Sequence, residues 1–211
     1  MQSLKDIAYD VIKNRILNCE IQGGERIRED LLAEDLNISR TPVREAINLL
    51  IMEGLVKNIP RKELHCVEIT TDEIHELCDM RKIYEIYAIK RSIEHCEPEH
   101  IEELENLAKE FERNSQRNQP AANIDVCLHG KIIHIAGNSK LTSVYSQIAN
   151  FLHIMTVMTE KKNPKIRNSE FVVEQHYQLV NSIRNKNEAQ AIALIENHID
   201  DMRMYLAVNG K

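Results

Sequence analysis

The sequence predicts a mainly α-helical chain in two parts, a small helical domain with one strand hairpin and then an all-α bundle of six or seven helices. Aromatic residues make up only 4% with no Trp, and Gly and Pro number 6 and 5 in 211 residues, which favours helices over a β-sandwich. Apolar residues recur every three or four positions over most of the chain, whereas a period of two occurs only near residues 55–69. The length suits one large domain or two modest ones.

Residues 1–70 are predicted to form three helices and a hairpin. Apolar residues at helical spacing predict a first helix over 4–19, which the Gly23-Gly24 pair ends. A short helix follows over 28–35. A tight turn is then expected at Asn37, because Asn tolerates the left-handed backbone conformation that such turns need.

The third helix is expected over 41–52. Ser39 precedes it as a suitable N-cap, Pro42 lies in the first turn, where a missing N–H group costs nothing, and Gly54 ends the helix. The apolar residues fall at intervals of three and four, so one face is buried and the opposite face is left exposed.

After the third helix the period of two predicts a hairpin, with strands at 55–59 and 67–69 around the polar stretch 60–63. Thr70 and Glu73 have the spacing of a capping box, so the all-α second domain is expected to fill residues 71–211. Its predicted helices lie at about 72–95, 98–115, 122–137, 140–161, 168–185 and 187–207.

Composition excludes several classes of protein. No stretch approaches the roughly 20 apolar residues that span a bilayer, and residues 1–17 are interrupted by charges, so we expect a cytoplasmic chain without a membrane partner. The five cysteines form an odd count with no CxxC pair, which suggests neither a disulfide framework nor a thiolate zinc site.

The order helix-turn-helix and then hairpin predicts a winged helix, in which the 41–52 helix enters the major groove of DNA. The formal net charge is −6, so DNA binding has to come from a local basic edge. Arg40, Thr41 and Arg44 lie off the apolar face at the start of this helix, and Arg28 flanks the same edge. The alternative is a structural helical domain whose arginines are solvated or pair with nearby acids, namely Glu29, Glu34 and Glu45.

The strings Arg26-Ile27-Arg28-Glu29, Leu32 to Ala46 and Glu53-Gly54-Leu55-Val56 closely resemble the DNA-binding domain of GntR-family bacterial transcription regulators. The match covers nearly all of residues 4–69, and its Ser-Arg-Thr-Pro-Val-Arg-Glu-Ala string is specific. The resemblance implies that Arg28, Arg40, Thr41 and Arg44 contact double-stranded, palindromic operator DNA, with the wing tip at the minor groove.

Two positions depart from the family pattern. Gly23-Gly24 stands where Pro-Gly is common, which should only loosen a turn. The wing tip lacks the usual glycine and carries Glu63, whose charge repels phosphate, so Arg61 and Lys62 are left to supply a looser electrostatic contact.

The histidines suggest a metal site. Asp125 and His129 are four residues apart on one predicted helix, so both side chains point from the same face. His176 and His198 lie on two further helices beside apolar residues at helical spacing, which places them near the bundle interior. One carboxylate and three imidazoles suit a divalent metal, zinc first, with nickel, manganese, iron or cobalt as alternatives. Scattered helical histidines also occur as ordinary core or surface residues.

Residues 71–211 resemble the FCD-type effector domain of the FadR-like branch, in which an Asp and three His at these four positions bind a metal. Arg81 and Glu85 match the Arg-x-x-x-Glu of its first helix, so the resemblance implies that Arg81 binds a small carboxylate effector. The alternative is that Arg81 only pairs with Glu85 on a solvated face. The other histidines are expected to be ordinary, namely His65, His75, His95, His100, His134 and His153.

Together these observations predict a homodimeric transcription regulator, not an enzyme, whose operator affinity depends on an organic acid bound beside a metal. Two alternatives remain. One is a metal-dependent hydrolase with an accessory helix-turn-helix, although no HExxH, phosphate loop or GxSxG motif supports it. The other is a direct metal sensor without an organic effector.

Overall fold

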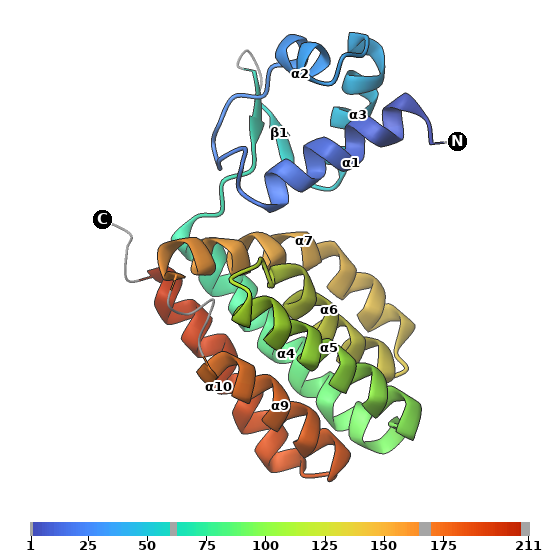
Figure 1. The fold of residues 1–211 in the computed structure, drawn as a ribbon, viewed down its shortest axis with the longest axis vertical. Coiled ribbons are helices and arrows are strands. Elements are labelled where there is room, and N and C mark those ends of the chain that lie inside the picture. The colour runs from blue at the N-terminus through green and yellow to red at the C-terminus, as the bar shows by residue number, and fades with distance from the viewer. Residues whose placement is uncertain (1, 60–62, 165–169, 208–211) are drawn as a thin grey trace. The chain divides into compact units, whose positions relative to one another are not determined.

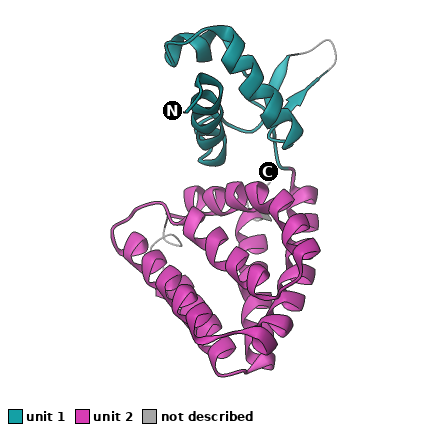
Figure 2. Cartoon of the chain, turned by 90° about the vertical axis from the view of Figure 1, so that its right-hand side faces the viewer, with its two compact units in different colours: residues 1–69 teal, residues 70–211 magenta. Residues whose placement is uncertain are grey.

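The computed structural model describes residues 2–59, 63–164 and 170–207. The chain divides into two units, Met1–Ile69 and Thr70–Lys211 (Figure 2). The predicted fold class is confirmed, since the N-terminal unit is a winged helix-turn-helix and the C-terminal unit is helical throughout its described ranges. Among the described helices, none is both long and apolar enough to cross a membrane.

The N-terminal unit is built around α3 (Figure 1). Its elements are α1 (Leu4–Leu17), α2 (Glu29–Asp35), α3 (Arg40–Met52), β1 (Val56–Asn58) and β2 (Leu64–Cys66). The third helix packs against α1, α2 and β1, and its apolar face is buried. This packing leaves the opposite face of α3 at the surface of the unit.

Positive backbone φ angles mark two of the predicted turns. Asn37 has φ 52° in the turn between α2 and α3, and Gly54 has φ 75° directly after α3, as the residue types predict. The end of the first helix differs from the prediction: α1 stops at Leu17, and Cys19 takes φ 50°, so the turn begins before Gly23-Gly24. Ser39 is the N-cap of α3, but its side chain makes no capping hydrogen bond.

The second strand of the hairpin lies earlier than predicted. β1 pairs with β2 in antiparallel register, with Lys57 opposite His65, whereas the prediction placed the strand at 67–69. The reason is a segment distant in sequence: Ile27 N donates to Leu64 O at 2.7 Å, and Cys66 N donates to Glu25 O at 2.8 Å. Hydrogen bonds on the far edge of β2 therefore fix which residues are extended.

The C-terminal unit is a helical bundle. Its described helices are α4 (Thr71–His95), α5 (Pro98–Gln116), α6 (Ala122–Ile135), α7 (Ser139–Lys162), α9 (Glu170–Arg184) and α10 (Glu188–Ala207). The longest, α4, packs against α6, α7, α9 and α10, and α5 covers α6 and α9 (Figure 1). The predicted capping box is confirmed, since Thr70 Oγ1 accepts from Glu73 N at 3.2 Å and Glu73 Oε2 accepts from Thr70 N at 2.8 Å.

The interior of the bundle is not wholly apolar. Buried Ile and Leu residues fill most of it, but a group of titratable side chains lies among them. Charged residues are rarely fully buried unless they are paired, so this group requires an explanation. Its members are Arg81, Glu85, Asp125, His129, His176 and His198.

Candidate metal centre and DNA-binding face

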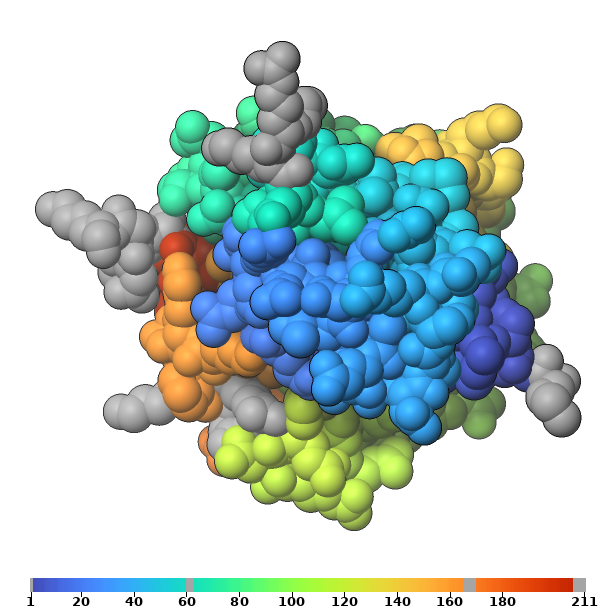
Figure 3. Space-filling model, turned by 90° about the horizontal axis from the view of Figure 1, so that it is seen from above, coloured from blue at the N-terminus to red at the C-terminus, as the bar shows by residue number. Residues whose placement is uncertain are grey.

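The exposed face of α3 carries three of the predicted DNA contacts. Arg40 and Thr41 open the helix and Arg44 follows one turn later, all with exposed side chains. On the opposite face Val43 and Ile47 are 0% and 1% exposed. Figure 3 shows the segment that runs from α2 into α3, in blue, at the surface of the N-terminal unit. Sequence periodicity therefore separated the two faces correctly.

Carboxylates contact two of the predicted DNA-binding arginines. Arg28 donates from Nη2 to Asp30 Oδ2 at 2.9 Å. Arg44 donates from Nε to Glu29 Oε1 and Oε2 at 3.3 and 3.2 Å, and from Nη2 to Oε2 at 2.9 Å. Without DNA, both arginines therefore form ion pairs at the protein surface. The alternative interpretation of the sequence had named Glu29 as one such partner.

The predicted wing contacts Arg61 and Lys62 lie outside the described residues. Glu63, the next residue, forms an ion pair with Arg26. This pairing offsets the negative charge of Glu63 within the protein.

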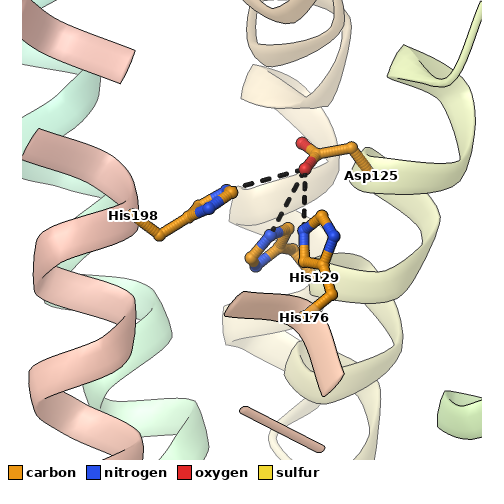
Figure 4. A group of neighbouring side chains, drawn as sticks. All are labelled: Asp125, His129, His176 and His198. Carbon is orange, nitrogen blue, oxygen red and sulfur yellow. Dashed lines mark ion pairs between the residues drawn. The ribbon is translucent and has the colours of Figure 1, made fainter. Parts of the chain in front are cut away.

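In the C-terminal unit, all four predicted metal ligands come together. Asp125 and His129 extend from α6, His176 from α9 and His198 from α10 (Figure 4). Asp125 Oδ1 lies 3.7 Å from Nε2 of His129, 3.2 Å from that of His176 and 3.6 Å from that of His198. No ligand in the set is more than 9% exposed.

This cluster fits a metal ion in size and in chemistry. One donor atom from each residue lies within 4.8 Å of the others. Metal–ligand distances of about 2.1 Å put two ligands of one ion at most about 4.2 Å apart, so a small inward movement suffices. Nε2 of His129, His176 and His198 is buried without a hydrogen-bond partner. Orphaned buried polar atoms are rare, and here three of them face one point.

Neighbouring side chains orient two of the imidazoles. Gln175 Nε2 donates to Asp201 Oδ2 at 3.0 Å, which turns Gln175 Oε1 toward His198 Nδ1 at 3.1 Å. Because Oε1 can only accept, Nδ1 of His198 carries the hydrogen and Nε2 presents its lone pair to the cluster. Glu85 Oε2 lies 2.7 Å from Nδ1 of His129, an ion-pair distance at which the negative charge favours a hydrogen on Nδ1 of that ring.

The electrostatics also favour neutral rings. Burial lowers the pKa of His198 to about 4, against the opposing charge of Asp125, and it also lowers the pKa of His176. Burial would raise the pKa of Asp125, but the electrostatic influence of the nearby imidazoles, His129 foremost, holds it well below its usual range. A carboxylate and at least two neutral imidazoles are thus available near neutral pH, the protonation state that a metal requires.

Arg81 lies beside the cluster. It is 1% exposed, its Nε donates to Glu85 Oε1 at 2.6 Å, and its Nη2 lies 3.8 Å from Asp125 Oδ2. The alternative of an Arg81–Glu85 pair on a solvated face is therefore wrong. Nη1 donates to Met202 Sδ at 3.7 Å, and a thioether sulfur is a weak acceptor. Apart from Glu85, the nearest carboxylate contact of the guanidinium is thus the longer one to Asp125.

A cavity of about 50 Å³ adjoins Asp125 and His198. It has room for one or two groups the size of a water molecule. Arg81 does not line it. Its other walls come from Phe111, Thr156, Thr159, Glu160, Val172, Asp201, Met202 and Tyr205. An open groove of about 790 Å³ between α5 and α9 contains none of the cluster residues.

Sequence reasoning missed the residues that support the cluster from other helices. Gln175 and Asp201 interact only across the α9–α10 contact, and Tyr145 of α7 donates to Glu85 Oε1 at 3.0 Å. His153, expected to be ordinary, has a buried Nε2 without a partner, and burial lowers its pKa against the opposing charge of Asp125. No spacing within one helix signals such contacts. His134 is exposed on α6, on the side that its helical angle predicts.

A winged helix-turn-helix joined to a helical bundle is the architecture of a DNA-binding transcription regulator, and the comparisons with known proteins agree. The FCD domain model matches residues 76–201, and the model of bacterial regulatory proteins of the gntR family matches residues 4–63. The chain therefore belongs to the GntR family of bacterial transcription regulators and carries an FCD domain.

Individual relatives are distant but extend along most of the chain. The HTH-type transcriptional regulator YdhC of Bacillus subtilis is 24% identical over 186 residues, covering 87% of this chain and 82% of that protein. The gluconate operon transcriptional repressor of Bacillus subtilis is 22% identical over 202 residues, covering 93% and 82%. The solved structure of McbR/YncC from E. coli has a TM-score of 0.78 at 20% identity, covering 99% and 97%. Family and relatives are regulators, so the hydrolase alternative is set aside and the chain is not an enzyme.

Proposed function

We propose that this regulator binds a palindromic operator as a homodimer, and that a small carboxylate effector bound at a divalent metal in the FCD domain controls its operator affinity. The observation that carries the proposal is the convergence of three imidazole Nε2 atoms on Asp125 Oδ1, with a buried guanidinium 3.8 Å from the other carboxylate oxygen.

The metal would be held by Asp125, His129, His176 and His198, and zinc is the ion we expect first. When bound, it would supply Lewis-acid attraction for an effector carboxylate. Manganese, nickel, iron and cobalt accept the same donor set, so the choice among them depends on metal supply as well as on the site.

Arg81 supports an anionic effector. Its charge is buried, and Glu85 occupies Nε, which leaves Nη1 and Nη2 on the side of Asp125 and Met202. A carboxylate that enters beside the cluster would gain a charge-assisted contact there. Because Arg81 does not line the 50 Å³ cavity, the side chain of Met202 has to shift for this contact to form. One relative is the gluconate operon transcriptional repressor, which makes gluconate the first acid to test and supports repression as the mode of action.

On the DNA side, we assign contacts to Arg28, Arg40, Thr41 and Arg44, with Arg61 and Lys62 at the wing. Two copies of α3 about 34 Å apart would meet successive major grooves, which is why a dimer and a palindrome are expected together. Effector binding then acts by coupling between the two sites. If the acid changes operator affinity by some factor, operator DNA changes the affinity for the acid by the same factor.

The test is selection of bound fragments from genomic DNA by the full chain at fixed salt, followed by titration of the selected sequence. Three states are compared: chelator-treated, metal-loaded, and metal-loaded with gluconate or another small mono- or dicarboxylate. Enrichment of a palindrome whose affinity changes only with metal and acid together supports the proposal. A change with metal alone indicates the direct metal sensor, and no enriched palindrome contradicts operator binding.

A further inference from the structure

The contact between Arg44 and Glu29 joins the two helices of the helix-turn-helix. Glu29 is the first residue of α2, and Arg44 lies on the exposed face of α3. The Arg44 side chain is 65% exposed, whereas that of Glu29 is 23% exposed, so the arginine reaches into solvent from a partly covered carboxylate. The pKa of Arg44 is raised by its hydrogen bonds and charge interaction with Glu29.

The atoms used in this contact leave a defined edge of the guanidinium unused. Glu29 receives hydrogen bonds from Nε and Nη2, the side edge of the group. The end edge keeps one N–H of Nη1 and one of Nη2, which point in parallel. Two parallel donors at this spacing match O6 and N7 of guanine, the commonest specific contact between arginine and a base. Glu29 therefore binds the side edge of the Arg44 guanidinium and leaves its end edge open to solvent.

Two other arginines on this face lack such a two-atom contact. Arg28 reaches Asp30 through Nη2 alone, at 2.9 Å, and one donor atom does not fix the orientation of the guanidinium. Arg40 forms no ion pair with any residue in the described part of the chain. Within the described part of this face, Arg44 is thus the arginine with its side edge fixed and its end edge open.

We propose that Glu29 is a positioning residue for base recognition, which fixes the Arg44 guanidinium so that its end edge contacts a guanine in each operator half-site. This inference rests on the proposed DNA contact of Arg44. Glu29 itself contacts no DNA. Its negative charge also weakens the attraction of Arg44 for phosphate, so the pair contributes to discrimination between sequences more than to general affinity.

The experiment uses the full chain and a sequence selected by the wild type from random duplex DNA. In that sequence each guanine is replaced in turn by 7-deazaguanine, which lacks the N7 acceptor, and by adenine. We expect one position per half-site at which either change weakens wild-type binding, by about 5- to 150-fold for adenine. In Glu29→Ala and Glu29→Gln this loss should shrink to less than about 3-fold at that position, with binding to non-specific DNA unchanged or tighter.

Matched variants separate the explanations. Glu34→Ala removes an exposed carboxylate from the same helix and should keep the full guanine preference. Arg44→Ala and the double variant Glu29→Ala/Arg44→Ala should show the same reduced preference, because Glu29 acts through Arg44. Thermal unfolding confirms that each variant is folded, and Glu29→Gln preserves side-chain volume if Glu29→Ala is unstable.

Two results would overturn the inference while leaving the regulator in place. One is a Glu29 variant that weakens binding to every sequence by the same factor. The other is an Arg44→Ala variant that loses affinity uniformly and has a smaller salt dependence, which is the behaviour of a phosphate contact. If the wild type selects no sequence at all, the proposed operator binding fails together with the inference.

Discussion

Oε2 of Glu85 lies 2.7 Å from Nδ1 of His129, and both side chains are buried in the bundle. The other oxygen of the same carboxylate accepts hydrogen bonds from Arg81 Nε at 2.6 Å and Tyr145 Oη at 3.0 Å. Burial disfavours ionisation, but the charges of Arg81 and His129 outweigh it and hold the pKa of Glu85 at about 2. One ionised carboxylate thus links the proposed effector-binding arginine to a proposed metal ligand.

We expect Glu85→Gln to weaken zinc binding by about 10- to 100-fold, the usual effect of losing an outer carboxylate at a metal-bound histidine. The amide keeps the volume but removes the charge that holds the hydrogen of His129 on Nδ1. Competition with a fluorescent chelator at neutral pH measures the change. Glu76→Gln, exposed on the same helix, is the control and should bind zinc like the wild type. Equal affinities for both variants would show that Glu85 does not act on His129.

His176→Ala should lower the metal content of the purified protein, because it removes the ligand whose Nε2 lies nearest Asp125 Oδ1, at 3.2 Å. Elemental analysis after dialysis against zinc measures the stoichiometry. His134→Ala serves as the matched control, since His134 is exposed on α6 and outside the cluster. Full stoichiometry in His176→Ala would remove this residue from the ligand set.

Metal affinity should rise with pH through the neutral range, because the ion competes with a proton for His129. Burial lowers the pKa of His129, but the charge of Glu85 outweighs it and raises the pKa above 6.5. In the metal-free chain this raised pKa stabilises the folded state below pH 6.5, and the contribution is lost as the pH rises through the folded-state pKa. Calorimetry in buffers of different ionisation enthalpy should detect a released proton in mildly acidic solution and none in mildly alkaline solution. Release that does not depend on pH would contradict this assignment.

Features of the fold that depend on neighbouring residues were predictable from the sequence. Asn37 and Gly54 supply positive φ angles where turns require them, and Thr70 and Glu73 form their capping box. The position of β2 was not predictable, because the backbone near Ile27 determines it through hydrogen bonds across the unit. Local chemistry defines helix ends, whereas strand register depends on partners that the spacing of residues does not reveal.

In the candidate site, too, the features set by spacing within one helix were predictable, whereas the contacts between helices were not. Asp125 and His129 lie one helical turn apart, so their common face follows from the sequence, and helical spacing places His198 toward the interior. The hydrogen bonds of Gln175 cross between helices, and periodicity within one helix gives no signal for them. The burial of Arg81 was also open at the sequence level, because an Arg-x-x-x-Glu pair has the same spacing on a solvated face as in a core.

The burial of Arg81 predicts a large stability effect that a surface pair would not give. Arg81→Met should lower the free energy of unfolding by about 3–5 kcal/mol, since it leaves the Glu85 carboxylate buried without its main counter-charge. Lys82→Met makes a comparable replacement one residue later, where the ammonium lies 2.7 Å from Asp200, whose side chain is 52% exposed. Exposed pairs contribute about 0–1 kcal/mol, so this control should lose no more than that. Urea unfolding of the metal-free chains measures both values. Because both variants place the same apolar side chain on α4, their difference isolates burial, and equal losses would show that water reaches Arg81 in solution.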